Sequence, residues 1–214
     1  MNIAPFATDR ELIVFARSFF RDRVGSFRKD VAICLTANRD RHHAYFPGLI
    51  TCIGFVDLLS GLHAGRLEGH GLQELKQYAS RFLNATNYSS LNLEVLYLAF
   101  RHKLALLSVP YVVFDITNRK EYTGQKQRRI TWSVHASRRK LAIEVLDLSP
   151  QQFLRKTLRP WPVHYNCRAV ISVSTFQSDI IKSIYGPMGY LRFLETDPSA
   201  RERFAKCMKM IFPP

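Results

Sequence analysis

Apolar residues recur at helical spacing through the first half of the 214-residue chain. Thr8 followed by Glu11 forms a capping box, which predicts the start of a helix, and Gly25 is expected to break that helix before a second stretch at residues 27–35. The same spacing predicts three further helices, over residues 48–63, 72–83 and 91–107. Because the connections between them are short, we expect an antiparallel four-helix bundle in residues 1–110.

The segment from residue 91 to residue 111 is apolar on nearly every side. One helical face carries Leu93 and Leu96, and the opposite face carries Leu91 and Val95, so both faces need apolar partners. We therefore expect this helix to lie at the centre of the bundle or between two subunits of a homodimer. A flank between these faces carries three polar residues at seven-residue intervals, namely Glu94, Arg101 and Ser108.

The pattern changes after Pro110, which cannot continue a helix. Residues 130–135 alternate apolar and polar side chains, which predicts a strand with one buried face. Trp132 is in phase with its apolar neighbours, so we expect it to pack in the core. Further strands are expected at residues 111–117, 141–148 and 168–173, and helices are expected to start near Ser149, Ser174 and Asp197.

These elements predict an α+β fold. Residues 1–110 would form the helical bundle. Residues 111–214 would form a basic region with a small antiparallel β-sheet and two or three helices, either separate from the bundle or packed with it as one domain.

Positive charge is concentrated in the second half of the chain. The formal net charge is +14, and residues 119–168 carry most of it. Such a surface attracts polyanions by releasing counterions, which favours RNA or DNA as a partner, although a solvated basic surface would have the same composition. The residues expected to contact nucleic acid are Arg119, Lys120, Lys126, Arg128, Arg129, Arg138, Arg139, Lys140 and Arg168.

The AFRHKLALL stretch on the fourth predicted helix resembles the HEPN superfamily of helical-bundle proteins. Active members of that superfamily pair an Arg with a His four to six residues later and cleave RNA without a metal, usually as dimers. Arg101 matches the Arg, but residues 105–107 are Ala, Leu and Leu, and His102 directly adjoins Arg101. The resemblance therefore implies a degenerate member that keeps the bundle and lacks the catalytic pair.

The missing His matters because metal-free RNA cleavage needs groups that exchange protons near neutral pH, and a guanidinium is too basic to do so. We therefore expect a non-catalytic nucleic-acid-binding or regulatory protein, in which Arg101 pairs with Glu94 or another acceptor. One alternative is a ribonuclease that uses Arg101 with His102 or a more distant histidine. Another is an antitoxin-like module that binds a partner protein.

Neither a cofactor nor a metal is expected. The chain lacks the glycine-rich and zinc-binding motifs of nucleotide-dependent enzymes and metallopeptidases, and Asp40, His42 and His43 are interpreted as a polar surface loop because adjacent histidines ligate one ion poorly. The four cysteines form no CxxC pair, which is typical of reduced thiols. The N-terminus does not resemble a secretion signal, so we expect a cytoplasmic protein that does not bind a membrane.

Overall fold

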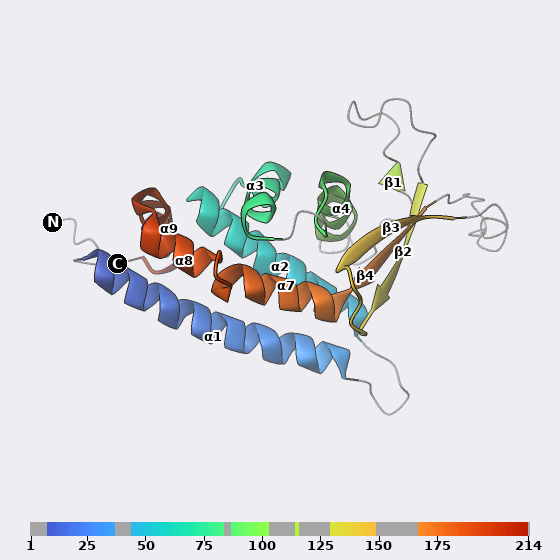
Figure 1. Cartoon of the computed structure of the whole chain (residues 1–214), viewed down its shortest axis with the longest axis horizontal. Helices are drawn as coiled ribbons and strands as arrows, with labels where there is room; N and C mark the ends of the chain where they lie inside the picture. The colour runs from blue at the N-terminus through green and yellow to red at the C-terminus, as the bar shows by residue number, and fades with distance from the viewer. Residues whose placement is uncertain are drawn as a thin grey trace.

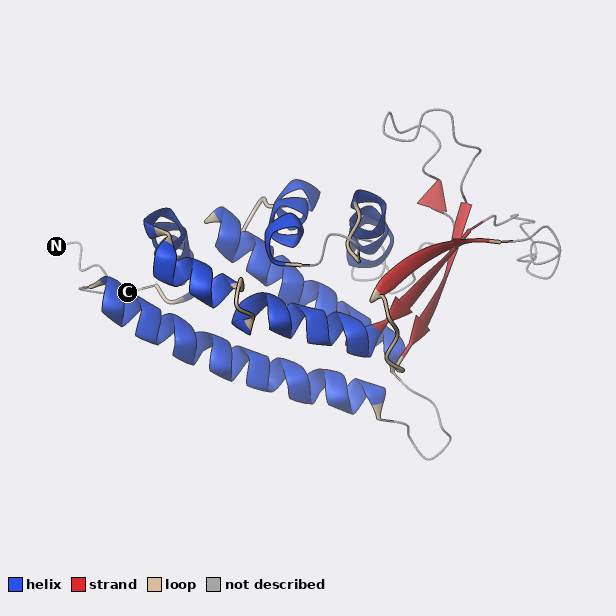
Figure 2. Ribbon diagram, in the orientation of Figure 1, coloured by secondary structure: helices blue, strands red, loops and turns tan. Residues whose placement is uncertain are grey.

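The computed structural model describes residues 8–36, 44–83, 87–102, 114–115, 129–148 and 167–213, and it shows an α+β protein (Figures 1 and 2). The helices of the first half are α1 (Asp9–Leu35), α2 (Tyr45–Ala64), α3 (Leu72–Phe82) and α4 (Ser90–Glu94), which continues as the π-helix η1 (Val95–His102). Those of the second half are α7 (Val173–Tyr185), α8 (Tyr190–Thr196) and α9 (Pro198–Ile211). The strands are β1 (Phe114–Asp115), β2 (Arg129–His135), β3 (Ile143–Asp147) and β4 (Cys167–Ser172).

Helix α1 is continuous, so the predicted break at Gly25 is wrong. The helix starts where Thr8 accepts a hydrogen bond from the Glu11 amide at 3.2 Å, and it then runs for 27 residues. A glycine inside a helix costs only about 1 kcal/mol relative to alanine. Val24 and Phe27 are buried on either side of it, and their packing outweighs that cost.

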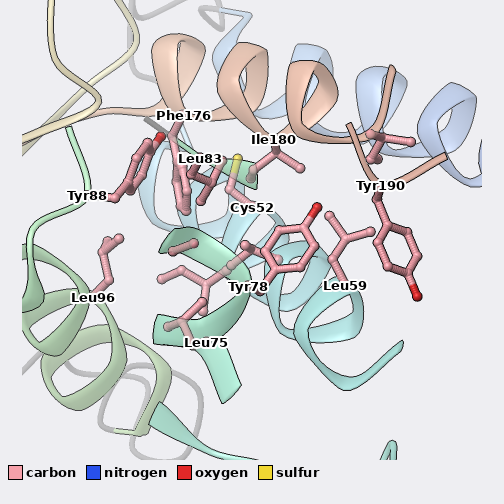
Figure 3. Packing of buried hydrophobic residues seen from close by; sticks show 14 of the residues in the cluster. Cys52, Leu59, Leu75, Tyr78, Leu83, Tyr88, Leu96, Phe176, Ile180 and Tyr190 are labelled. Atoms are coloured by element: carbon pink, nitrogen blue, oxygen red, sulfur yellow. The ribbon is translucent and has the colours of Figure 1, made fainter. Parts of the chain in front are cut away.

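The helices of the two halves share one hydrophobic core. Helix α2 contacts α1 and α3 from the first half, and α7 and α9 from the second. The core joins Phe20, Tyr78, Phe176, Tyr190 and Phe204, all fully or almost fully buried, and Figure 3 shows part of this packing around Tyr78 and Tyr190. The layer around α2 is therefore built from both ends of the sequence.

Helix α2 also has the length and hydropathy of a membrane-spanning helix. More than half of its apolar window is buried inside the protein, and helices pack against it on several sides. Packing inside the protein therefore accounts for much of the apolar surface of α2.

The sheet is mixed, which corrects the prediction of an antiparallel sheet. Its strand order is β1-β2-β4-β3, in which β2 runs parallel to β4 and the other neighbours are antiparallel. Strand β4 lies between β2 and β3, so the short loop at residues 136–142 crosses the end of β4 and does not close a hairpin. Trp132 of β2 packs edge-on against Phe46 of α2 with ring centroids 4.8 Å apart, which confirms that it packs against the core.

Candidate anion-binding groove

The loop between β2 and β3, residues 136–142, lies where the sheet meets the N-terminus of α7 (Figure 2). We call it the basic loop because Arg138, Arg139 and Lys140 follow one another at its centre. Strand β4 ends beneath the loop at Ser172, and α7 begins at the next residue. The loop is therefore supported from below by a strand end and a helix start.

Hydroxyl groups at the start of α7 hold the backbone of the basic loop. Thr175 Oγ1 accepts a hydrogen bond from the Arg139 amide and donates one to the Arg139 carbonyl, each at 2.9 Å. Ser172 Oγ donates to the Ser137 carbonyl at 2.7 Å, and the Ser172 amide donates to the Ala142 carbonyl at 2.8 Å. Because these contacts use loop backbone atoms, the basic side chains stay exposed while the loop keeps one conformation.

The same hydroxyl groups cap α7. Ser172 is the N-cap residue, and its Oγ accepts from the Thr175 amide at 3.2 Å. Ser174 Oγ also donates to the Ala136 carbonyl. The positive end of the α7 dipole therefore lies directly beside the basic loop and adds to its attraction for anions.

A groove of about 470 Å³ opens beside the basic loop. Its charged lining residues are four cations and one carboxylate, namely Arg138, Arg139, Lys140, Lys182 and Asp179. The remaining lining residues are polar or apolar, namely Phe82, Leu83, Asn87, Thr175 and Ser178.

Asp179, the one acid that lines the groove, is held by a hydrogen bond. Asp179 Oδ2 accepts a hydrogen bond from the Tyr88 hydroxyl at 3.0 Å, while Arg138, Arg139, Lys140 and Lys182 are all exposed. The groove can thus offer several cations, an amide and hydroxyl groups to a phosphate-bearing chain.

His135 ends β2 immediately before the basic loop. Its Nε2 lies 3.2 Å from Ser133 Oγ. Partial burial, and secondarily the positive charge of Arg139, lower the pKa of His135 below its ordinary value. The imidazole is therefore neutral at pH 7, and the charge of the groove comes from its arginines and lysines.

Of the nine predicted nucleic-acid contacts, the structure brings Arg138, Arg139 and Lys140 together in the groove. Arg168 is half-buried near the start of β4, about 13 Å along the strand from Ser172. Arg129 begins β2, and its side chain lies outside the described part of the chain. Four others also lie outside the described residues, namely Arg119, Lys120, Lys126 and Arg128.

Sequence reasoning missed Lys182. It lies on the exposed face of α7, forty residues after the end of the basic loop, where a single lysine is unremarkable in sequence. A basic position on the predicted helix after residue 174 was the only available signal. The fold brings Lys182 into the groove because α7 starts beneath the basic loop.

Arg101 and His102 end the π-helix η1, and their side chains lie outside the described part of the structure. Glu94, the acid expected to pair with Arg101, and Asp57 of α2 have other neighbours among the described residues. Buried Glu94 forms an ion pair with Lys76, with 2.8 Å between Oε1 and Nζ, and Asp57 Oδ1 lies 3.2 Å from His70 Nε2.

Within the described ranges no three His, Cys, Asp or Glu side chains come together as metal ligands. The loop residues Asp40, His42 and His43 lie outside these ranges. Cys34, Cys52, Cys167 and Cys207 all lie in the described ranges and form no disulfide bond.

No family model matches the sequence, and neither the curated proteins nor the solved structures contain a significant match to it. The resemblance to HEPN proteins stays a prediction.

Proposed function

We propose that this protein binds nucleic acid, without cleaving it, through the basic loop and the groove beside it. The observation that carries the proposal is the tethering of the basic loop, which carries Arg138, Arg139 and Lys140, by hydrogen bonds from its Ser137 and Arg139 backbone to the Ser172 and Thr175 hydroxyl groups. Flexible cations lose conformational entropy when they bind phosphate. A loop that is already held in place loses less, so the same charges bind more tightly.

Charge and shape favour a nucleic-acid backbone over a single small anion. Arg138, Arg139 and Lys140 are a row of three consecutive exposed cations, and the exposed Lys182 lines the same groove. Successive phosphates of one strand match such a row, while Asn87 and Ser178 can donate hydrogen bonds to sugar or phosphate oxygens. These contacts position a strand and read no sequence, so we expect binding with little sequence preference.

The test is binding of a fluorescent single-stranded RNA of about 20 nucleotides across a salt series. Four phosphate contacts predict a slope of log K against log salt of about −3. A triple variant, Arg138→Gln, Arg139→Gln and Lys140→Gln, is expected to bind more weakly and to lose about two units of that slope.

A second triple variant serves as the matched control. Arg10→Gln, Lys206→Gln and Lys209→Gln remove the same charge from exposed positions on α1 and α9, far from the sheet (Figure 1). If both triple variants bind alike, net charge alone drives binding and the proposed groove is wrong. Absence of binding by the unaltered protein at low salt would also reject the proposal.

One observation favours the ribonuclease alternative. Arg101 and His102 lie in a π-helix, and π-helical turns frequently occur at functional sites. Denaturing gels of the same RNA samples test this alternative. Our proposal predicts intact RNA, whereas cleavage that disappears in Arg101→Ala would establish a ribonuclease.

A further inference from the structure

A second basic hollow, of about 570 Å³, lies at the C-terminal end of α2. Its lining comes from α2, α3, α9 and the turn after α2, and it consists of His63, Ala64, Arg66, Glu74, Gln77, Arg81 and Arg203. No residue lines both this hollow and the groove beside the basic loop. At the end of α3, Arg81 lines one of them and its neighbour Phe82 lines the other.

Glu74, the one carboxylate that lines this hollow, already has two partners. Glu74 forms an ion pair with Arg66 and accepts a hydrogen bond from the Gly71 amide at 2.8 Å. The Gly71 hydrogen bond, with a further contribution from Arg66, lowers the pKa of Glu74 below its ordinary value. Among the described residues no carboxylate lies within ion-pair distance of Arg81 or Arg203, so two guanidinium groups remain available.

Packing holds both of these arginines in place. The Arg81 guanidinium lies over the Phe193 ring, with 3.8 Å between Cζ and the ring centroid. Arg203 packs so closely on Gly65 that an added Cβ would approach Arg203 Cγ to 2.9 Å, and Gly65 adopts a left-handed φ of 76°. The Arg81 guanidinium group and the Arg203 stem are therefore held by packing before any ligand arrives.

The end of α2 does not need these arginines as capping groups. The Arg66 amide donates to the Gly61 carbonyl at 3.1 Å, and the Gly65 amide donates to the Leu62 carbonyl at 3.4 Å. The backbone thus satisfies these last carbonyls itself. Capping of α2 therefore does not account for Arg81 and Arg203.

His63 is one of the residues that line the hollow. Its ring packs against Phe82 and Phe193, with centroids 5.3 and 5.8 Å away, and its buried Nδ1 has no hydrogen-bond partner among the described residues. Burial, then the charges of Arg203 on α9 and Arg81 on α3, lower the pKa of His63 to about 4, against the opposing charge of Asp197. An anion between the two arginines would offset their repulsion of a protonated imidazole.

We propose that this hollow binds a small phosphate- or sulfate-class dianion through the guanidinium groups of Arg81 and Arg203, next to the His63 ring. Paired guanidinium groups bind tetrahedral oxyanions by charge-assisted hydrogen bonds. The anion can be inorganic phosphate or the phosphate of a phosphorylated metabolite. The proposal is independent of nucleic-acid binding at the basic loop.

The test follows the His63 ring signals by NMR during titration with inorganic phosphate, sulfate and adenosine monophosphate, with chloride at matched ionic strength as the reference. We expect saturable shifts with the dianions and a rise in the pKa of His63 when phosphate is bound. If phosphate binds more tightly than adenosine monophosphate, the ligand of the hollow is an inorganic anion. If adenosine monophosphate binds more tightly, the ligand is a phosphorylated metabolite.

Variants locate the binding site. Arg81→Gln and Arg203→Gln should each weaken phosphate binding about tenfold or more, because each removes a charge-assisted contact. Lys206→Gln, an exposed cation on α9 outside the hollow, should leave it unchanged, as should Arg138→Gln in the basic loop. Shifts that match those in chloride would overturn the proposal. So would a phosphate affinity of Arg81→Gln and Arg203→Gln equal to that of the unaltered protein, with the His63 signals still dispersed.

Discussion

Single residues in this protein combine burial with positive surroundings, and His63 is the clearest case. Its ring lies among the aromatic rings of Tyr78, Phe82, Tyr190 and Phe193. This environment favours the neutral imidazole and lowers its pKa to about 4. In the unfolded chain the pKa returns to about 6.5.

The lowered pKa of His63 predicts that the protein loses stability in mild acid. Between pH 6.5 and pH 4 the unfolded chain binds a proton on His63 that the folded protein does not, so the free energy of unfolding falls as the pH falls. After allowance for partial exposure, the contribution is about 1 kcal/mol between pH 7 and pH 5. We expect urea unfolding at pH 7 and at pH 5 to show a smaller loss of stability for His63→Phe than for the unaltered protein.

His135→Phe is the control for this measurement. Its imidazole is also neutral at pH 7, but it is less buried, so its replacement should change the pH dependence less. Equal pH dependence in the unaltered protein and in His63→Phe would contradict the assigned environment of His63.

At the scale of elements, local pattern predicted helices better than it predicted strand pairing. Helix α9 starts as expected at Asp197, whose Oδ1 accepts from the Ser199 and Ala200 amides at 2.8 and 3.2 Å. The insertion of β4 between β2 and β3 depends on contacts between residues far apart in sequence, which hydrophobic periodicity does not report. The predicted helix near Ser149 lies outside the described residues.

The junction between the basic loop and α7 gives a prediction that leaves charge unchanged. Thr175→Val keeps a β-branched side chain and removes both hydrogen bonds to the Arg139 backbone. The loop should become more mobile, and RNA affinity should fall by about three- to tenfold, because ordering the loop then opposes binding. Fluorescence anisotropy at fixed salt measures the change.

Thr51→Val is the matched control, because Thr51 donates only to the Pro47 carbonyl one turn earlier in α2, at 2.8 Å, and does not line the groove. An affinity of Thr175→Val equal to that of Thr51→Val would show that tethering of the loop contributes nothing to binding.

At the scale of the whole molecule, composition predicted that the second half is basic but not where its charges gather. Arg138, Arg139 and Lys140 meet in the groove because they are consecutive on one short loop. Lys182 joins them only because β4 leads directly into α7, and Arg168 lies toward the other end of β4. Tertiary arrangement therefore decides which of the many cations share a site.

The predicted homodimer belongs to the same scale. It follows from the two apolar faces of the fourth predicted helix. In the structure Leu93 and Leu96 are buried against the shared core. On the predicted opposite face Val95 is also buried, and Leu91 is partly buried. The dimer stays a prediction.

The most direct test of the central claim is an amide NMR map of the isotope-labelled 24.8 kDa chain during titration with single-stranded RNA at low salt. We predict that the largest shifts fall on residues 138–140 and on α7 between Ser178 and Lys182, and that added salt reverses them. Shifts confined to other surfaces, such as η1 or the exposed face of α1, would contradict the claim that the basic loop is where this protein holds nucleic acid.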